Sequence, residues 1–148
     1  MSMLHATTLA RRVDGVWRGV LVRGPSGSGK SDLALRALHA GWRLVTDDRT
    51  LVWMSGGELY GRAPQTISGL LEARGVGVVP ICALGFTRIA LVVDAVSEPV
   101  ERMPDPAEIP ILAARIPRLQ LDLRQASALA KIGLALEGRG GHSGGGRL

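Results

Sequence analysis

Short apolar runs, separated by polar or glycine-rich turns, make up the first two thirds of the chain. The Val-, Ile- and Leu-rich runs that predict strands lie at 4–10, 19–23, 43–46, 76–81 and 88–95. The last two runs are apolar at successive positions, which is typical of central strands covered on both faces. Residues 51–54 and 58–60 flank a Ser-Gly-Gly turn and predict a hairpin.

Helical spacing of apolar residues is less frequent. It is strongest at Lys30–His39, a segment that ends before Gly41, and weaker at 63–71 and 127–136. The alternation of strands with a few helices predicts an α/β fold built on a mixed, mostly β central sheet.

The last third of the chain has a weaker pattern. Several prolines within 98–110 predict a loop, and 117–123 is typical of an edge strand. Residues 138–148 are so rich in glycine that we expect a flexible tail. The predicted organisation is one domain over residues 1–137 followed by this tail.

The composition agrees with one globular domain in a reducing compartment. The 148 residues are 46% hydrophobic and 21% charged, which argues against disorder. The single cysteine, Cys82, argues against a disulfide framework or a cysteine metal cage, so we expect a cytoplasmic protein. We expect neither a signal peptide nor a membrane span, because every apolar run is too short for one.

The net charge of +5 points to anionic ligands. Among the 18 Lys and Arg residues only Lys30 and Lys131 are lysines, and the arginines are scattered. Scattered charge and few aromatic residues disfavour a nucleic-acid surface. Phosphate-bearing small ligands use the same charge equally well.

Residues 24–31 satisfy the phosphate-loop pattern between a predicted strand and a predicted helix. Its glycines let backbone amides wrap phosphate oxygens at the N-terminus of the helix. Lys30 can reach the β and γ phosphates of a nucleotide, and the Ser31 hydroxyl can hold Mg²⁺. The expected nucleotide-binding residues are Gly24, Pro25, Ser26, Gly27, Ser28, Gly29, Lys30 and Ser31. The alternative is a glycine-rich turn that caps a helix.

Asp47 and Asp48 follow the predicted strand 43–46. Ligands of open α/β sheets bind at the carboxyl ends of strands, where an acidic pair would face the γ phosphate. One carboxylate can help to hold Mg²⁺ while the other accepts a proton from an attacking hydroxyl. The alternative is a turn or a helix cap, since Asp favours both.

Two other charged positions have ordinary structural interpretations. Glu72 and Arg74 lie beside Gly75 and Gly77, where a surface ion pair at a helix end would have the same residues. A single histidine near the start of a chain, such as His5, is usually structural or solvated.

In chain order the motifs resemble the catalytic domain of the HPr kinase/phosphorylase family, in a short form without its separate N-terminal domain. The matching segments are HAT at 5–7, GPSGSGKSDLAL from 24, GWRLVTDD at 41–48, GRAP at 61–64, LLEARGVGVV at 70–79 and LVVD at 91–94. LLEARGVGVV discriminates best, because it separates this family from other small phosphate-loop kinases. The resemblance spans about residues 4–136 and implies a fold similar to the nucleotide domain of PEP carboxykinase.

The resemblance implies an ATP- and Mg²⁺-dependent enzyme that phosphorylates a serine of HPr, a phosphocarrier protein of the phosphotransferase systems. It also implies removal of that phosphate by phosphorolysis, with inorganic phosphate consumed and pyrophosphate released. The catalytic residues it implies are Asp48, Asp47, His5, Lys30 and Arg102, and the metal ligands are Ser31, Glu72 and Asp47. Members form hexameric rings, so we expect an oligomer of undetermined size.

Two alternatives remain open. A kinase of a small metabolite would use the same phosphate loop, but the chain offers no long segment for a dedicated lid. A non-catalytic nucleotide-sensing module would bind ATP without turnover, and it would not need the acidic pair at 47–48.

Overall fold

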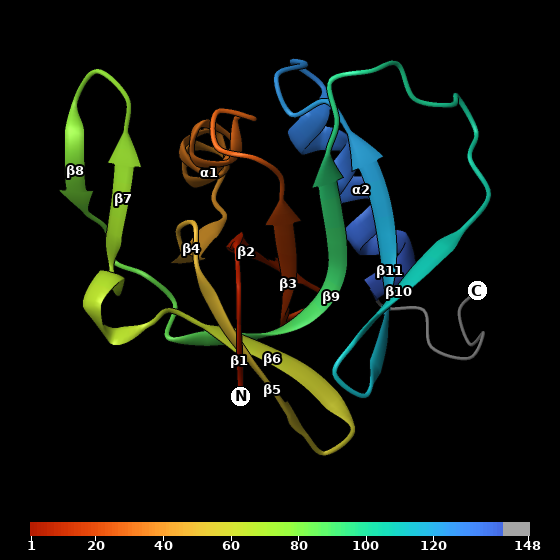
Figure 1. Cartoon of the computed structure of the whole chain (residues 1–148), viewed down its shortest axis with the longest axis horizontal. Helices are drawn as coiled ribbons and strands as arrows, with labels where there is room; N and C mark the ends of the chain where they lie inside the picture. Colours follow the sequence, from red (N-terminus) through yellow and green to blue (C-terminus); the bar gives the residue numbers. More distant parts are fainter. Residues whose placement is uncertain (141–148) are drawn as a thin grey trace.

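The structure, a computed structural model, describes residues 1–140. This part of the chain forms a nine-stranded sheet, a separate two-stranded hairpin and two α-helices (Figure 1). The strands of the large sheet are β1 (Ser2–Leu4), β2 (Ala6–Val13), β3 (Val16–Arg23), β4 (Arg43–Thr46), β5 (Thr50–Ser55), β6 (Glu58–Arg62), β9 (Phe86–Ala95), β10 (Ala107–Ile111) and β11 (Ala114–Leu121). The helices are α1 (Lys30–His39) and α2 (Ala128–Gly140).

The strand directions gather four strand ends at one edge of the sheet. Strands β3, β9 and β11 are parallel neighbours, and β2 is antiparallel to both β3 and β4. The carboxyl ends of β3, β4, β9 and β11 therefore lie on the same side as the start of β2. This is the edge at which open α/β sheets bind their ligands.

Strand β9 joins the two parts of the sheet. Its first residues pair with β6 of the β5–β6 hairpin, and its later residues pair with β3 on one side and β11 on the other. The side chains of β9 cover both faces of the sheet, with a register shift against β3 between Ile89 and Leu91. Leu91 and Val93 face one hydrophobic cluster, whereas Ile89 and Val92 face the other.

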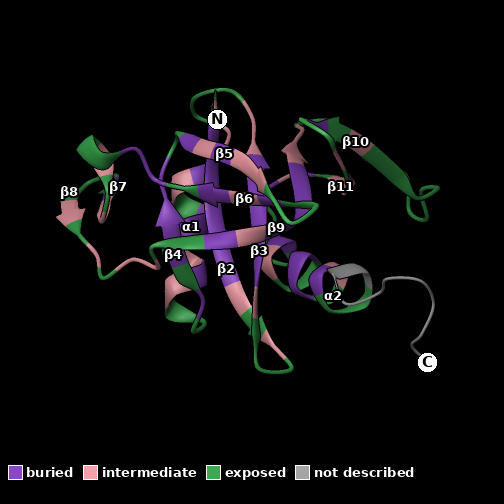
Figure 2. Cartoon of the chain, turned by 90° about the horizontal axis from the view of Figure 1, so that it is seen from below, coloured by how far each residue is buried: buried purple, intermediate pink, exposed green. Residues whose placement is uncertain are grey.

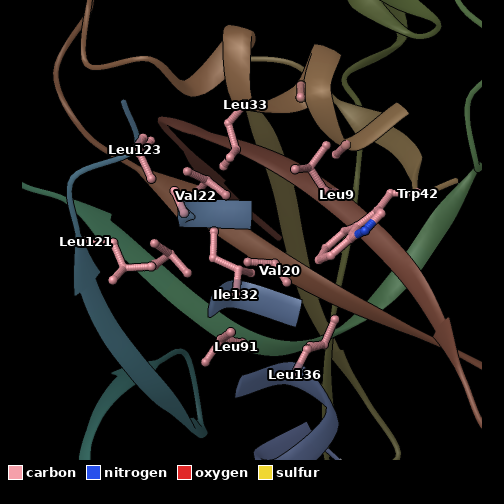
Figure 3. Packing of buried hydrophobic residues seen from close by; sticks show 14 of the residues in the cluster. Leu9, Val20, Val22, Leu33, Trp42, Leu91, Leu121, Leu123, Ile132 and Leu136 are labelled. Atoms are coloured by element: carbon pink, nitrogen blue, oxygen red, sulfur yellow. The ribbon is translucent and has the colours of Figure 1, made fainter. Parts of the chain in front are cut away.

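The two helices cover one face of the sheet. Figure 3 shows Leu33 of α1 and Ile132 and Leu136 of α2 against Val20 and Leu91 of the sheet. All five side chains are at most 1% exposed. Full burial of such a side chain contributes about 1.5–3 kcal/mol, so this layer anchors the strand that leads into residues 24–29.

Several sequence predictions are confirmed. The fold is a mixed, sheet-dominated α/β fold with few helices, and the helix Lys30–His39 and the strand Arg43–Thr46 have the predicted bounds. The predicted hairpin is the pair β5 and β6. Local signals sufficed here because glycines end the helix and form the hairpin turn, with positive φ at Gly41, Gly56 and Gly57.

The helix predicted at 63–71 is wrong. This segment contains only a 3-10 turn at Gln65–Ile67, followed by strand β7 (Leu70–Ala73). Gly69 lies between them with φ 74°, a left-handed conformation that interrupts a helix. Leu71 and Ala73 are buried while their neighbours are more exposed, which is the two-residue period of a strand.

The central strand predicted at 76–81 is also wrong. Its residues form β8 (Gly77–Pro80), which pairs only with β7 in a hairpin set apart from the main sheet (Figure 2). Val76 and Val78 are 76% and 65% exposed. An apolar run in the sequence therefore predicts a strand, but it does not predict whether that strand is central or peripheral in the sheet.

The C-terminal part differs from its prediction in three places. The predicted loop 98–110 ends in strand β10, which has a free edge that tolerates Pro110. The predicted edge strand 117–123 is β11, which begins earlier, at Ala114, and ends at Leu121; its residues 114–118 pair with β10 and its residues 118–121 pair with β9. Helix α2 continues to Gly140, into the predicted tail, and residues 141–148 lie outside the described part.

Candidate functional site

The phosphate loop connects β3 to α1 at the edge where the strand ends meet. A Cβ atom on Gly24 would lie 2.7 Å from both the Ala95 Cβ and the Ser28 Oγ, so only glycine fits where the loop leaves the sheet. Gly29 precedes α1 with φ 100°. The Lys30 Nζ donates hydrogen bonds to the carbonyl oxygens of Gly24 (2.7 Å) and Pro25 (3.1 Å). The lysine thus folds back over its own loop.

Asp47 is the centre of the site. It follows β4, is 8% exposed, and accepts hydrogen bonds from the Ser31 Oγ at 2.8 Å to Oδ1 and 3.1 Å to Oδ2. The Thr7 Oγ1 donates to Oδ1 at 3.1 Å, and the Glu72 backbone N–H donates to Oδ2 at 3.3 Å. Residues from α1, β2 and β7 therefore converge on one carboxylate, and all of the donors are neutral.

Asp48 has a strained backbone and an exposed side chain. Its φ is 69°, and the Arg49 N–H donates to the Asp47 carbonyl at 2.8 Å across it, which makes a γ-turn of the rare kind. The Thr7 Oγ1 accepts a hydrogen bond from the Asp48 N–H at 3.0 Å. Such strain is found where surrounding structure enforces it, typically at functional sites. Because of this turn the two adjacent carboxylates lie in different surroundings: Asp47 is buried and Asp48 lines a cavity.

A cavity of about 400 Å³ lies over the loop and the acidic pair. Its lining combines phosphate-loop residues, acidic side chains and two arginines: Ser26, Gly27, Gly29, Lys30, Ser31, Asp32, Leu35, Asp48, Glu72, Ala73, Arg74 and Arg124. The β7–β8 hairpin supplies Glu72 to Arg74, so this hairpin forms one wall. Cationic side chains bind phosphate groups and carboxylates bind a metal ion, so this mixed lining suits a phosphate ligand that carries a metal ion.

The chemistry of the donors fits Mg²⁺. The Ser31 hydroxyl and the Asp47 carboxylate lie within hydrogen-bond distance, and Mg²⁺ prefers such hard oxygen ligands. Within residues 1–140 no three His, Cys, Asp or Glu side chains are grouped as a protein-only metal cage would need. Mg²⁺ characteristically uses one or two carboxylates with water and substrate phosphates instead.

The structure brings most of the predicted site residues together, but not all of them. Lys30, Ser31, Asp48 and Glu72 line one cavity, and Asp47 is hydrogen-bonded beneath it. His5, between β1 and β2, and Arg102, in the segment 96–106, are both exposed and line neither cavity at the phosphate loop. Their roles remain predictions.

Two residues at the site were missed by the sequence analysis. Thr7 bridges the acidic pair from β2, and its place inside the HAT segment was the available signal. Arg124 donates from its guanidinium to the Gly27 carbonyl at 2.6 Å. No local pattern marks Arg124, because it reaches the loop only through the fold.

A second carboxylate at the same edge is paired with cations. Asp94, in β9, accepts from the Arg23 Nε at 2.7 Å and the Arg118 Nε at 2.6 Å. Burial alone would raise the pKa of Asp94, but the hydrogen bonds and charges of both arginines outweigh it and lower that pKa. Hydrogen bonding to Asp94 in turn raises the pKa of Arg23 against the effect of burial. Arg23 immediately precedes the phosphate loop.

Comparison with known proteins gives a family match over most of the chain. Residues 4–133 match the family model described as HPr Serine kinase C-terminal domain. The HPr kinase/phosphorylase of Clostridium perfringens (strain SM101 / Type A) is 44% identical over 72 residues, which are 49% of this chain and 24% of that protein. The chain thus spans about a quarter of that relative's length. The HPr kinase/phosphorylase of Clostridium kluyveri (strain NBRC 12016) is 46% identical over 66 residues, 45% of this chain and 21% of that protein.

A solved structure has the same fold. The HPr(Ser) kinase/phosphatase from Coxiella burnetii superposes with a TM-score of 0.75, covering 93% of this chain and 94% of that one at 22% identity. At this identity the likeness concerns the fold. Among the described helices none is both long and apolar enough to cross a membrane.

Proposed function

Because the chain belongs to the family of HPr serine kinase C-terminal domains, we propose that it transfers the γ-phosphoryl group of ATP to a serine of an HPr-like phosphocarrier protein. The observation that carries the proposal is the convergence of Ser31 and Asp47 beneath a cavity that Lys30 and Asp48 line. We further propose the reverse reaction, in which inorganic phosphate removes the phosphoryl group as pyrophosphate.

Each side chain has a defined part in the proposed transfer. The Asp48 carboxylate accepts the proton of the acceptor hydroxyl as that oxygen bonds to the γ phosphorus and the bond to the ADP oxygen breaks. Lys30 stabilises the charge on the phosphates. Ser31 and Asp47 would hold Mg²⁺, with Glu72 as a further ligand, and the ion would neutralise phosphate charge.

In the reverse direction the same proton returns. An oxygen of inorganic phosphate bonds to the phosphorus of phosphoserine, the bond to the serine oxygen breaks, and protonated Asp48 gives its proton to that oxygen. The products are unmodified HPr and inorganic pyrophosphate, and the proton that the attacking hydrogen phosphate loses replaces the one that Asp48 gave to the serine oxygen. We propose a cytoplasmic setting and an oligomeric state for the enzyme, as the family resemblance implies.

The decisive test is an acceptor assay. Incubation with ATP, Mg²⁺ and an HPr-like protein should yield phosphoserine, detected by mass spectrometry. Asp48→Asn should keep ATP binding and lower the transfer rate by about 10²–10⁴-fold, because general-base catalysis contributes that much. Arg115→Ala is the control, since Arg115 is exposed on β11 and pairs with Glu108. Absence of phosphoserine in the wild type would refute the proposal, and transfer to a small acceptor or to none would favour the alternatives.

A further inference from the structure

The phosphate loop also borders a second cavity. This cavity, of about 360 Å³, lies between loop residues 25–28 and residues 95–98, which end and follow β9. Ser26, Gly27 and Arg124 line both this cavity and the one over the acidic pair. Arg124 is therefore the one charged side chain of residues 1–140 that borders both cavities.

Arg124 lies across the apex of the loop. Its guanidinium donates to the Gly27 carbonyl at 2.6 Å, and its Cγ is 3.7 Å from the position that a Cβ on Gly29 would take. The residue is nevertheless exposed, so its charged end is accessible to a ligand at the loop. A guanidinium has five donors, and this one hydrogen bond leaves most of them available.

The backbone at Arg124 is held by the helix that follows the phosphate loop. The Arg124 N–H donates to the Asp122 Oδ1 at 3.0 Å. The Arg36 guanidinium of α1 donates to the carbonyl oxygens of Leu123 and Gln125, on either side of Arg124. Arg36 also pairs with Asp32 in the first turn of the helix. The position of Arg124 relative to the loop is thus built into the fold.

Lys30 and Arg124 have equivalent arrangements. Each cation donates to carbonyl oxygens of the phosphate loop, Lys30 at its start and Arg124 at its apex. A carbonyl is a neutral acceptor, whereas hydrogen bonds from a guanidinium to a phosphate are charge-assisted and roughly twice as strong. A polyphosphate on the loop would therefore outcompete the Gly27 carbonyl for Arg124.

We infer that Arg124 binds the polyphosphate of the nucleotide, as a second cation opposite Lys30, and exchanges the Gly27 carbonyl for phosphate oxygens when the ligand binds. The inference rests on the proposed function in so far as it takes the ligand to be a nucleoside triphosphate or pyrophosphate. It assigns to the β11–α2 connection a direct part in substrate binding.

The test compares Arg124→Gln, Arg124→Lys and the wild type by calorimetric titration with inorganic pyrophosphate and with MgATP. Glutamine can still donate to the Gly27 carbonyl but carries no charge. The Arg124→Gln variant should bind both ligands about 10- to 100-fold more weakly, as expected for a lost hydrogen bond between charged groups. Arg124→Lys should recover part of the affinity. Thermal unfolding of both variants should match the wild type, with Arg115→Gln as the matched control.

Unchanged pyrophosphate affinity in Arg124→Gln would contradict the inference. If Arg124 only braces the loop, Arg124→Gln binds pyrophosphate as tightly as the wild type, and the inference is overturned. Phosphoserine formation on HPr is measured in parallel with the wild type. Weaker pyrophosphate binding by Arg124→Gln, in a protein that does not phosphorylate HPr, would support the inference while refuting the proposed function. Full affinity in the variant beside normal HPr phosphorylation would refute the inference alone.

Discussion

Asp47 and Asp94 are two carboxylates at the same edge of one sheet, and their partners differ in charge. The side chain of Asp94 is 18% exposed and accepts from two guanidinium groups. Asp47 is 8% exposed and accepts from two hydroxyls and a backbone N–H, and no described cationic side chain forms a salt bridge with it. Asp94 joins three parallel strands, whereas Asp47 joins the phosphate loop to the acidic turn.

We propose that the difference in partners separates a structural carboxylate, Asp94, from a metal-binding carboxylate, Asp47. The charge of Asp94 is neutralised by Arg23 and Arg118, so it has little left to attract a metal ion. Neutral donors orient Asp47 but leave its negative charge uncompensated, and a buried charge without a counter-ion is costly. A cation that arrives with the substrate would supply the missing charge. The comparison predicts that Asp47 governs activity and Asp94 governs stability.

The largest effect is expected from Asp47→Asn. Removal of the charge should lower phosphoryl transfer by at least about 100-fold, because the site would lose its buried anionic oxygen for the metal and a metal supplies several kcal/mol of charge stabilisation. Because asparagine retains the shape and an acceptor, the free energy of unfolding should change by no more than about 1 kcal/mol. Transfer rates over a Mg²⁺ titration, together with urea unfolding, check both statements. A stability loss larger than the activity loss would reverse the assignment.

A large stability effect is expected from Asp94→Asn. The substitution removes the charged partner that Arg23 and Arg118 share, and it should lower the free energy of unfolding by about 1–3 kcal/mol. The lower part of that range is favoured because both arginines are about one third exposed to water. Urea unfolding measures the change. Glu108→Gln, which breaks the exposed pair with Arg115, is the matched control and should cost at most about 1 kcal/mol.

The contribution of Asp94 should depend on pH in a defined direction. Its folded-state pKa is lowered, so its stabilising effect is complete above the ordinary carboxyl pKa and is lost as the pH falls through the lowered value. The difference in unfolding free energy between the wild type and Asp94→Asn should be constant from about pH 7 to 5 and shrink below about pH 4. Urea unfolding at a series of pH values tests this. A difference that grows toward acid pH would contradict the pairing.

The smallest effect is expected from Thr7→Val. Valine removes the donor to Asp47 and the acceptor for the Asp48 N–H while keeping the shape of the side chain. Each lost hydrogen bond of this kind costs about 1 kcal/mol, and the one that orients the Asp47 carboxylate is taken to act on transfer, so we expect about a fivefold lower transfer rate. Thr7→Ser, which keeps the hydroxyl, should restore the rate. If the serine variant is as slow as the valine variant, the methyl group rather than the hydroxyl matters.

The sequence analysis succeeded where neighbouring residues determine the structure. The phosphate loop, the helix Lys30–His39 and the acidic pair at 47–48 follow from glycines, a helical period and a strand end. It failed where packing partners decide. The same apolar character occurs in β8 and in β9, yet β8 lies in an exposed hairpin and β9 crosses the core. Periodicity describes the faces of a strand but not its neighbours.

The site shows the same division. The sequence by itself predicted a phosphate loop at residues 24–31 and determined that Asp47 and Asp48 lie at a strand end, because both depend on short-range backbone geometry. Only the tertiary structure decided that Thr7 and Ser31 meet at Asp47, that Asp94 is neutralised by arginines, and that Arg124 crosses the loop. The physical reason is that strand order sets which charges meet, and strand order depends on contacts between residues far apart in the chain.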